Sequence, residues 1–114
     1  MVTIYHNPRC RKSREGLQIL EGQGVEYSIY NYIKEPLTYL EILELLKKLN
    51  IEPIELVRTN EQVWKENYKD KDLTKEEIVR AMEEHPKLIE RPIVVRDDKA
   101  IIGRPPSKIS LLFN

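Results

Sequence analysis

The first third of the chain alternates short apolar runs with polar breaks, a pattern that predicts a strand, a helix and a second strand. Residues 2–5, "VTIY", are typical of a buried strand, and residues 25–32, "VEYSIYNY", begin with apolar–polar alternation and are rich in β-formers. Residues 13–24, "SREGLQILEGQG", fit a helix that ends near Gly22 or Gly24, where glycine can take a left-handed cap. Its expected core positions are Leu17, Ile19 and Leu20. Two strands joined by a helix favour a parallel βαβ unit.

The middle of the chain has helical spacing. Thr38 and Glu41 match a capping box ahead of "YLEILELLKKL". Thr74 and Glu77 match a second one ahead of "KEEIVRAMEEH", a helix that must end before Pro86. Between the two helices, "PIELVR" indicates a short helical turn and "NEQVWKENY" a short helix or a loop. The expected apolar stripe of the first helix is Leu40, Leu43 and Leu46, with Ile42 and Leu49 beside it.

The last third predicts a hairpin followed by a closing helix. Residues 92–95, "PIVV", and residues 100–102, "AII", fit two strands joined by the turn "RDDK". "SKISLLF" fits a helix with Ser107 as its N-cap. The element order predicts an α/β fold with a four-stranded mixed sheet and a helical insertion over about residues 36–86. At this length we expect a single domain, 1–114.

Composition excludes several classes of protein. Hydrophobic residues make up 40% and charged residues 33%, which is typical of a folded globular chain. The net charge of zero argues against a nucleic-acid partner, and no apolar run approaches the roughly 20 residues of a membrane span. The N-terminal stretch lacks a basic segment followed by a long apolar one, so we expect no signal peptide and a cytoplasmic location. The single cysteine cannot form an internal disulfide.

The distribution of charge is more informative than its sum. Residues 1–14 carry four bases and no acid, and residues 99–114 carry three bases and no acid. Residues 35–84 carry 13 acids and 8 bases. If the two basic ends meet in the fold, they form a face that attracts anions.

The only cysteine, Cys10, lies in "YHNPRCRKSRE", between the first strand and the helix that follows. A helix N-terminus offers unpaired N–H groups and the positive end of the helix dipole. Together with the surrounding cations, these groups favour a thiolate and can also hold an anion. The pattern therefore predicts a nucleophile beside an oxyanion site. The alternative, a buried and inert cysteine, is disfavoured by this placement.

Spacing separates the possible thiol mechanisms. Ser13 stands where thioredoxin-type proteins carry a second cysteine, so a mixed disulfide on Cys10 needs an external thiol to resolve it. Low-molecular-weight cysteine phosphatases need an arginine where this chain has Gly16. His6 could stabilise the thiolate or pass a proton, or it could simply bond the backbone; Ser13 could donate to the thiolate or cap the helix. One cysteine and two histidines, with His85 far along the chain, match no zinc spacing, so no metal is expected.

Three arginines stand at element boundaries, in "LVRTN", "IERPIVV" and "IIGRPPS". They are Arg58, Arg91 and Arg104. The planar guanidinium fork suits tetrahedral oxyanions, although a single arginine is more often an ordinary surface residue. No periodicity shows that the three converge.

At these residues the chain resembles a known family. "HNPRCRKSR" is similar to the signature H-N-P-x-C-x-x-S-R of the glutaredoxin-coupled arsenate reductases. The segments "LVRTN", "HPKLIERPIVV" and "IGRPP" follow in the order and spacing of that family, so the resemblance covers essentially the whole chain. It implies a thioredoxin-like fold, in which the acidic helical middle is the family's insertion.

The resemblance also implies a chemistry, the reduction of arsenate with glutathione as co-substrate, glutaredoxin as protein partner and no bound cofactor. The implied residues are Cys10 as the nucleophile, His6 and Ser13 as its supports, Arg58, Arg91 and Arg104 as arsenate ligands, and Pro92 as the cis-proline of the fold. Two rivals stay open. One is a regulator of the same fold that binds RNA polymerase, although members of that branch often carry the C-x-x-C that this chain lacks. The other is a glutathione-dependent reductase of a different oxidant.

Overall fold

The computed structural model describes residues 1–113, which form two compact units. The sheet unit joins Met1–Glu35 to the segment that begins at Arg91, and the helical unit is Pro36–Glu90. The predicted insertion, 36–86, falls inside the helical unit, while the single domain stays a prediction. No helix within residues 1–113 is both long and apolar enough to cross a membrane.

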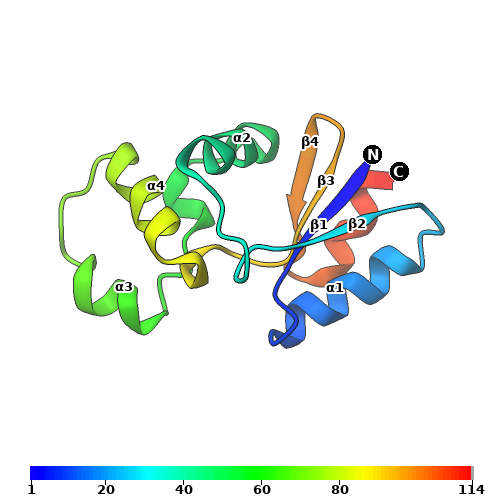
Figure 1. The fold of residues 1–114 in the computed structure, drawn as a ribbon, viewed down its shortest axis with the longest axis horizontal. Helices are drawn as coiled ribbons and strands as arrows, with labels where there is room; N and C mark the ends of the chain where they lie inside the picture. The colour runs from blue at the N-terminus through cyan, green and yellow to red at the C-terminus, as the bar shows by residue number, and fades with distance from the viewer. Residues whose placement is uncertain (114) are drawn as a thin grey trace. The chain divides into compact units, whose positions relative to one another are not determined.

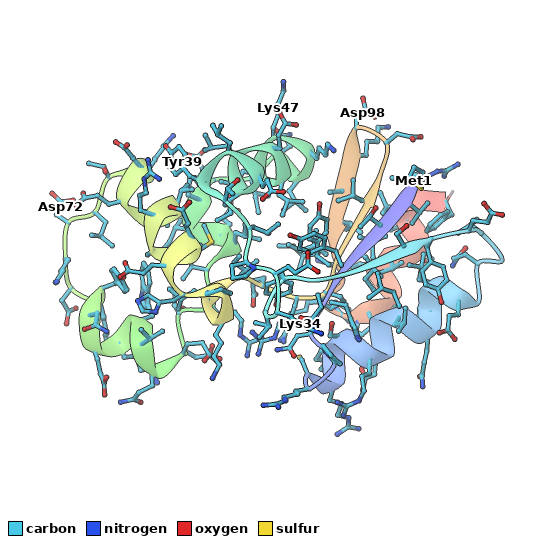
Figure 2. All side chains as sticks on the ribbon, in the orientation of Figure 1. Met1, Lys34, Tyr39, Lys47, Asp72 and Asp98 are labelled. Carbon is cyan, nitrogen blue, oxygen red and sulfur yellow. The ribbon has the colours of Figure 1, made fainter. Side chains whose placement is uncertain are left out.

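The sheet unit contains one mixed sheet with the strand order β2-β1-β3-β4 (Figure 1), which confirms the predicted four strands. Its elements are β1 (Val2–His6), α1 (Arg11–Glu21), β2 (Ser28–Asn31), β3 (Ile93–Arg96), β4 (Lys99–Ile102) and the 3₁₀ helix η3 (Pro106–Phe113). As predicted, β1 and β2 are parallel, and β3 and β4 form an antiparallel hairpin. The hairpin turns at Asp97 and Asp98 (Figure 2), and the Asp97 carboxylate lies 3.1 Å from the N-terminal amine.

The register of the strands brings four chain segments to one end of β1. His6, the last residue of β1, pairs with Asn31 of β2, and Tyr5 pairs with Ile93 of β3. Ile93 in turn pairs with Ile102 of β4. The residues that follow β1, β2 and β4 therefore lie at the same edge as those that precede β3. We call this edge the C-terminal edge of β1.

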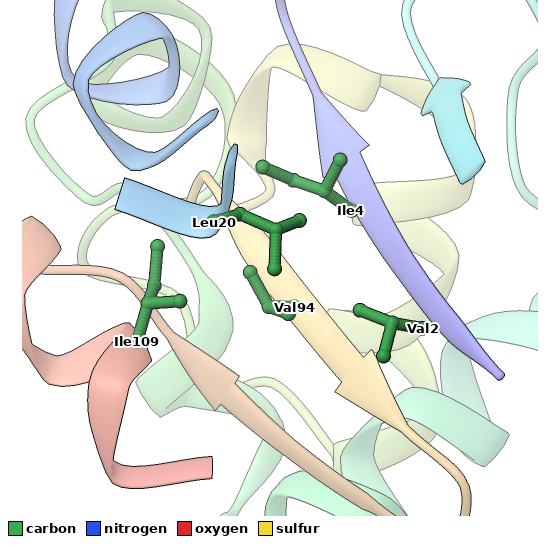
Figure 3. Packing of buried hydrophobic residues seen from close by; sticks show 5 residues of the cluster. All are labelled: Val2, Ile4, Leu20, Val94 and Ile109. Carbon is green, nitrogen blue, oxygen red and sulfur yellow. The ribbon is translucent and has the colours of Figure 1, made fainter. Parts of the chain in front are cut away.

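The core of the sheet unit lies between the sheet and the two helices on it. Figure 3 shows Val2, Ile4 and Val94 of the sheet beside Leu20 of α1 and Ile109 of η3. Leu17 and Ile19, also expected in the core, are partly buried against it. Each fully buried aliphatic side chain contributes about 1.5–3 kcal/mol, so this cluster fixes α1 on the sheet.

Helix α1 begins two residues earlier than predicted. Cys10 has extended backbone angles, φ −94 and ψ 123, and its carbonyl accepts from the amide of Arg14, so Cys10 is the N-cap. The predicted start at Ser13 is wrong because the Ser13 hydroxyl bonds residues before the helix. At the other end, Gly22 is right-handed, and only Gly24 takes the left-handed conformation.

Two further element boundaries differ from the prediction. Strand β2 spans only Ser28–Asn31, because β1 offers partners only for these four residues. The last element is a 3₁₀ helix that already begins at Pro106, so Ser107 is not its N-cap. Proline favours the first helical position because its missing N–H would be unpaired there. The Ser107 carbonyl instead accepts from the hydroxyl of Ser110.

The helical unit contains α2 (Tyr39–Leu49), η1 (Pro53–Leu56), α3 (Gln62–Asn67), α4 (Lys75–Glu84) and η2 (Pro86–Leu88). Both predicted capping boxes are present, Thr38 with Glu41 and Thr74 with Glu77. The turn at "PIELVR" and the short helix in "NEQVWKENY" are also confirmed.

The apolar stripe predicted for α2 is confirmed at Ile42 and Leu46 and wrong at Leu40 and Leu43. Leu40 is 71% exposed and Leu43 is 38% exposed. The buried residues of α2 are Ile42, Leu45 and Leu46, and α2 packs on α4. Because leucine or isoleucine fills nearly every second or third position of α2, the pattern fits two helix faces equally well. Packing on α4, not periodicity, selects the face.

Candidate active site

Cys10 lies in a loop that leaves the C-terminal edge of β1. The amide of Cys10 donates to the Asn7 carbonyl at 3.0 Å, and the amide of Arg9 donates to Asn7 Oδ1 at 3.0 Å. Asparagine side chains that bond two residues ahead close tight turns of this kind. The turn ends with Cys10 as the N-cap of α1, with a partly exposed thiol. The thiol therefore lies where the positive end of the helix dipole acts on it.

Ser13 ties the first turn of α1 to the end of β1. Its side chain is fully buried, and Oγ accepts from the amide of Asn7 at 3.0 Å and lies 2.8 Å from His6 Nδ1. Burial lowers the pKa of His6; the contact with Ser13 opposes this shift, and the positive charge of Arg14 adds to it. The ring therefore favours its neutral form, in which it can exchange a hydrogen bond with the serine.

Arg91 is the cation that lowers the pKa of Cys10. Burial alone would raise the pKa of Cys10, but a hydrogen bond from the Arg91 guanidinium and the amides of Ser13 and Lys12 outweigh it and lower that pKa. The thiol makes no capping hydrogen bond of ordinary geometry, so the two amides act on sulfur mainly as nearby dipoles. Arg91 is only 9% exposed, and its charge is therefore weakly screened.

Arg104 lies beside Arg91. Its Nε donates to the Arg91 carbonyl at 3.0 Å, and the amide of Gly103 donates to the Pro92 carbonyl at 2.8 Å. The Gly103–Pro92 bond continues the β3–β4 pairing past the ends of the strands, and the Arg104 side chain adds a bond to the residue before Pro92. The Arg91–Pro92 bond is cis, as the resemblance implied, and so is Arg104–Pro105.

Arg58 belongs to the helical unit. Its Nε donates to Glu61 Oε2 at 3.3 Å, its Nη1 lies 3.9 Å from Glu90 Oε1, and its amide donates to the Leu88 carbonyl. The structure therefore places Cys10, Arg91 and Arg104 in the sheet unit and Arg58 in the helical unit. A role of Arg58 in binding substrate stays a prediction.

The remaining bases around Cys10 are exposed. The basic cluster consists of Arg9, Arg11, Lys12 and Arg14. Glu15 partly neutralises it, since its carboxylate lies 3.2 Å from Arg11 Nε and 3.7 Å from Lys12 Nζ. Arg14 donates to the Pro8 carbonyl at 2.9 Å, a bond that holds the loop against the helix. Both basic ends of the chain belong to the sheet unit.

Three residues of this region were assigned no role in the site from the sequence alone. Asn-Pro predicts the turn that Asn7 closes, but not the bond from its side chain that shapes the loop. Tyr32 is fully buried at the end of β2, but inside a run of β-formers nothing distinguishes it from a core tyrosine. Gly16 lies so close to Pro92 that a Cβ there would be 2.5 Å from Pro92 Cγ. A glycine within a helical pattern is only a weak signal of such a contact.

The arrangement suits one kind of chemistry. A thiolate stabilised by a guanidinium is a ready nucleophile, and the same guanidinium can hold an oxyanion that the sulfur attacks. Within residues 1–113, no three His, Cys, Asp or Glu side chains are gathered to hold a metal ion.

Known proteins of similar sequence and structure identify the family to which this chain belongs. A family model described as the ArsC family matches residues 5–111. An arsenate reductase of Haemophilus influenzae is 43% identical over 110 residues, which cover 95% of each chain. The uncharacterized protein YfgD of Escherichia coli K12 is 46% identical over 110 residues, 95% of this chain and 92% of the relative. The solved structure of an arsenate reductase from Vibrio cholerae superposes with a TM-score of 0.90 at 43% identity, over 95% of this chain and 93% of that one. This chain therefore belongs to the ArsC family and has its thioredoxin-like α/β fold.

Proposed function

We propose that this protein reduces arsenate to arsenite, with Cys10 as the nucleophile and glutathione and glutaredoxin as external thiol reductants. The single observation that carries the proposal is the position of Cys10, the N-cap of α1, at the same end of the sheet as Arg91 and Arg104. This arrangement places a thiolate and the cations that can bind an anion at the same end of the sheet. The arsenate reductases among the relatives support the choice of substrate.

In the first step, the Cys10 thiolate attacks arsenic, a sulfur–arsenic bond forms, and one arsenate oxygen leaves as water after protonation. Arg91 and Arg104 neutralise the charge of the remaining oxygens as the adduct forms. Arg58 is the third ligand in this proposal. The thiolate needs no general base for the attack, because Arg91 and the helix N-terminus already favour its charged form.

In the second step, the glutathione thiolate attacks the Cys10 sulfur, and the electron pair of the sulfur–arsenic bond passes to arsenic. Arsenic gains two electrons and leaves as arsenite, while Cys10 and glutathione are oxidised to a mixed disulfide. Because the chain contains no second cysteine, an outside thiol must release Cys10. Glutaredoxin does so in this proposal by taking the glutathione.

The test is a coupled assay with arsenate, glutathione, glutaredoxin, glutathione reductase and NADPH. Wild-type protein should consume NADPH, and Cys10→Ser should abolish this. Arg91→Ala and Arg104→Ala should lower kcat/KM for arsenate by roughly ten- to a hundredfold, the loss expected for one charged hydrogen bond. Arg96→Ala is the matched control, because Arg96 ends β3 at the opposite end of the strand and bonds the Leu112 carbonyl.

The other outcomes separate the rivals. Full turnover by Cys10→Ser would refute the mechanism. Glutathione-dependent NADPH use that needs Cys10 but occurs only with another oxidant would overturn arsenate as the substrate and keep the thiol chemistry. Capture of RNA polymerase together with absence of turnover would favour the regulator.

A further inference from the structure

The Ser13 hydroxyl lies between the last residue of β1 and the first residue of the loop that leads to Cys10. Its oxygen is 3.0 Å from the amide nitrogen of Asn7 and 2.8 Å from Nδ1 of His6. The Ser13 side chain is fully buried, and His6 is only 6% exposed, so water has little access to either bond. One hydroxyl therefore joins the first turn of α1 to the end of β1.

The direction of the bond between Ser13 and His6 follows from the hydrogens that are available. A hydroxyl has one hydrogen and two lone pairs, and the Asn7 amide, which can only donate, takes one lone pair. Within residues 1–113, His6 Nδ1 is the only acceptor described for the hydroxyl hydrogen, and the Cys10 sulfur is not one. If Nδ1 itself donated, the buried hydroxyl hydrogen would be left unpaired, at the cost of its desolvation.

Two consequences follow for the side chains around sulfur. The neutral His6 ring, the form that burial favours, accepts at Nδ1 and carries its hydrogen on Nε2. The Ser13 hydroxyl gives its only hydrogen to this ring. It therefore has none to donate to a thiolate at Cys10.

The bond from Asn7 to Ser13 also fixes the loop. The amide of Cys10 donates to the Asn7 carbonyl at 3.0 Å, and the amide of Arg9 donates to Asn7 Oδ1 at 3.0 Å. Asn7 is the acceptor in both bonds, so the turn that ends at Cys10 follows the position of Asn7. Because the Asn7 amide is held by a buried side chain of α1, the turn and the helix keep a fixed relation to each other.

We propose that Ser13 is a positioning residue whose hydroxyl accepts from the Asn7 amide and donates to His6 Nδ1, which fixes the loop of Cys10 without any bond to sulfur. This is a different role from the support of the thiolate that the resemblance implies. The inference rests on the proposed function only in taking Cys10 as the reactive group. It does not depend on arsenate being the substrate.

The first measurement uses the wild-type protein, labelled with nitrogen-15. At about pH 8 the ring of His6 is neutral, and long-range correlations from its carbon-bound protons identify the protonated nitrogen by NMR. We expect the hydrogen on Nε2, together with a slowly exchanging Ser13 hydroxyl proton that shows a nuclear Overhauser effect to the His6 ring. A hydrogen on Nδ1 would overturn the proposal.

The second measurement uses Ser13→Ala, which removes both bonds and keeps the backbone amide of residue 13. The Asn7 amide should exchange with deuterium roughly ten- to a hundredfold faster than in the wild type, as expected for the loss of one buried hydrogen bond. The midpoint of Cys10 alkylation by iodoacetamide against pH should stay at its wild-type value. If the hydroxyl donated to the thiolate, its removal would instead raise this midpoint by roughly one to two pH units.

Ser110→Ala is the matched control, because the Ser110 hydroxyl bonds the Ser107 carbonyl within η3 at 2.8 Å. It should change neither the exchange of the Asn7 amide nor the alkylation midpoint. An upward shift of the midpoint in Ser13→Ala, or exchange of the Asn7 amide at the wild-type rate, would overturn the proposal. If Ser13→Ala does not fold, the tautomer of His6 in the wild type still decides. None of these measurements uses arsenate, so failure of arsenate turnover and failure of this inference are distinguishable.

Discussion

At the scale of single residues, His6 couples the acidity of the medium to the stability of the site. Its folded pKa is lowered by burial, with a further contribution from the charge of Arg14. The unfolded chain therefore binds a proton at a higher pH than the folded one, and stability is lost as pH falls through the interval below the unfolded value, about 6.5. We expect the urea midpoint of the wild type to fall between about pH 7.5 and pH 5.5.

The comparison variant is His6→Asn, whose side chain can still bond Ser13 but does not titrate in this range. We expect a clearly smaller loss of stability over the same interval, measured by urea unfolding at both pH values. His85→Asn removes the other histidine, which lies in the helical unit, and should keep the wild-type loss. An undiminished loss in His6→Asn would mean that another group causes it.

At the scale of elements, the position of α1 depends on a glycine. A Cβ on Gly16 would lie 2.5 Å from Pro92 Cγ and 3.0 Å from Ile109 Cδ1. Gly16→Ala must therefore push the helix away from β3 or from η3. We expect a loss of about 1–3 kcal/mol in the free energy of unfolding, together with slower alkylation of Cys10, because the helix that carries Cys10 moves relative to the residue after Arg91.

Gly22→Ala is the control within the same helix. Gly22 is right-handed with φ −68, and a Cβ there would meet nothing closer than 3.4 Å. This substitution should leave alkylation unchanged and could stabilise the chain by up to about 1 kcal/mol, because alanine restricts the unfolded state. Equal effects of the two substitutions on the free energy of unfolding, measured in urea, would show that the contact of Gly16 with Pro92 does not set the position of α1.

How far sequence predicts these elements depends on whether the signal is local. The boxes at Thr38 and Thr74 were predicted because cap and helix lie within four residues. The start of α1 was not, because Ser13 is a good N-cap by type but is used by β1. The buried face of α2 depends on contact with α4, and no pattern within α2 contains that information.

At the scale of the whole molecule, the site is an assembly of segments far apart in the chain. The loop after β1, the residue after β2, the start of β3 and the end of β4 meet only through the strand register. Cys10 could be identified from its surroundings in sequence alone. The convergence of Arg91 and Arg104 required the sheet order, whereas the place of Arg58 in the helical unit follows from the insertion predicted over about residues 36–86.

One further prediction concerns how the charges of the molecule affect the reaction of Cys10 with anions. The chain carries 19 basic and 19 acidic residues, so its net charge gives Cys10 no preference for anions. Any such preference must come from local charges, which include Arg91, Arg104 and the basic cluster, and Glu15 opposes the cluster by pairing with Arg11 and Lys12. Glu15 follows Cys10 by five residues, which corresponds to a rise of about 7.5 Å along the helix axis, so we take the separation of the two side chains as about 10 Å.

Glu15→Gln should therefore speed the reaction of Cys10 with an anionic reagent, dithiobis(nitrobenzoate), relative to neutral dithiodipyridine. A unit charge at about 10 Å in water changes such a rate roughly twofold per charge on the reagent, and high salt should remove the difference. Glu26→Gln makes the same charge change beyond the far end of α1 and should leave the ratio unchanged. If both variants raise the ratio equally, the effect follows net charge, and the basic cluster does not steer anions toward the sulfur.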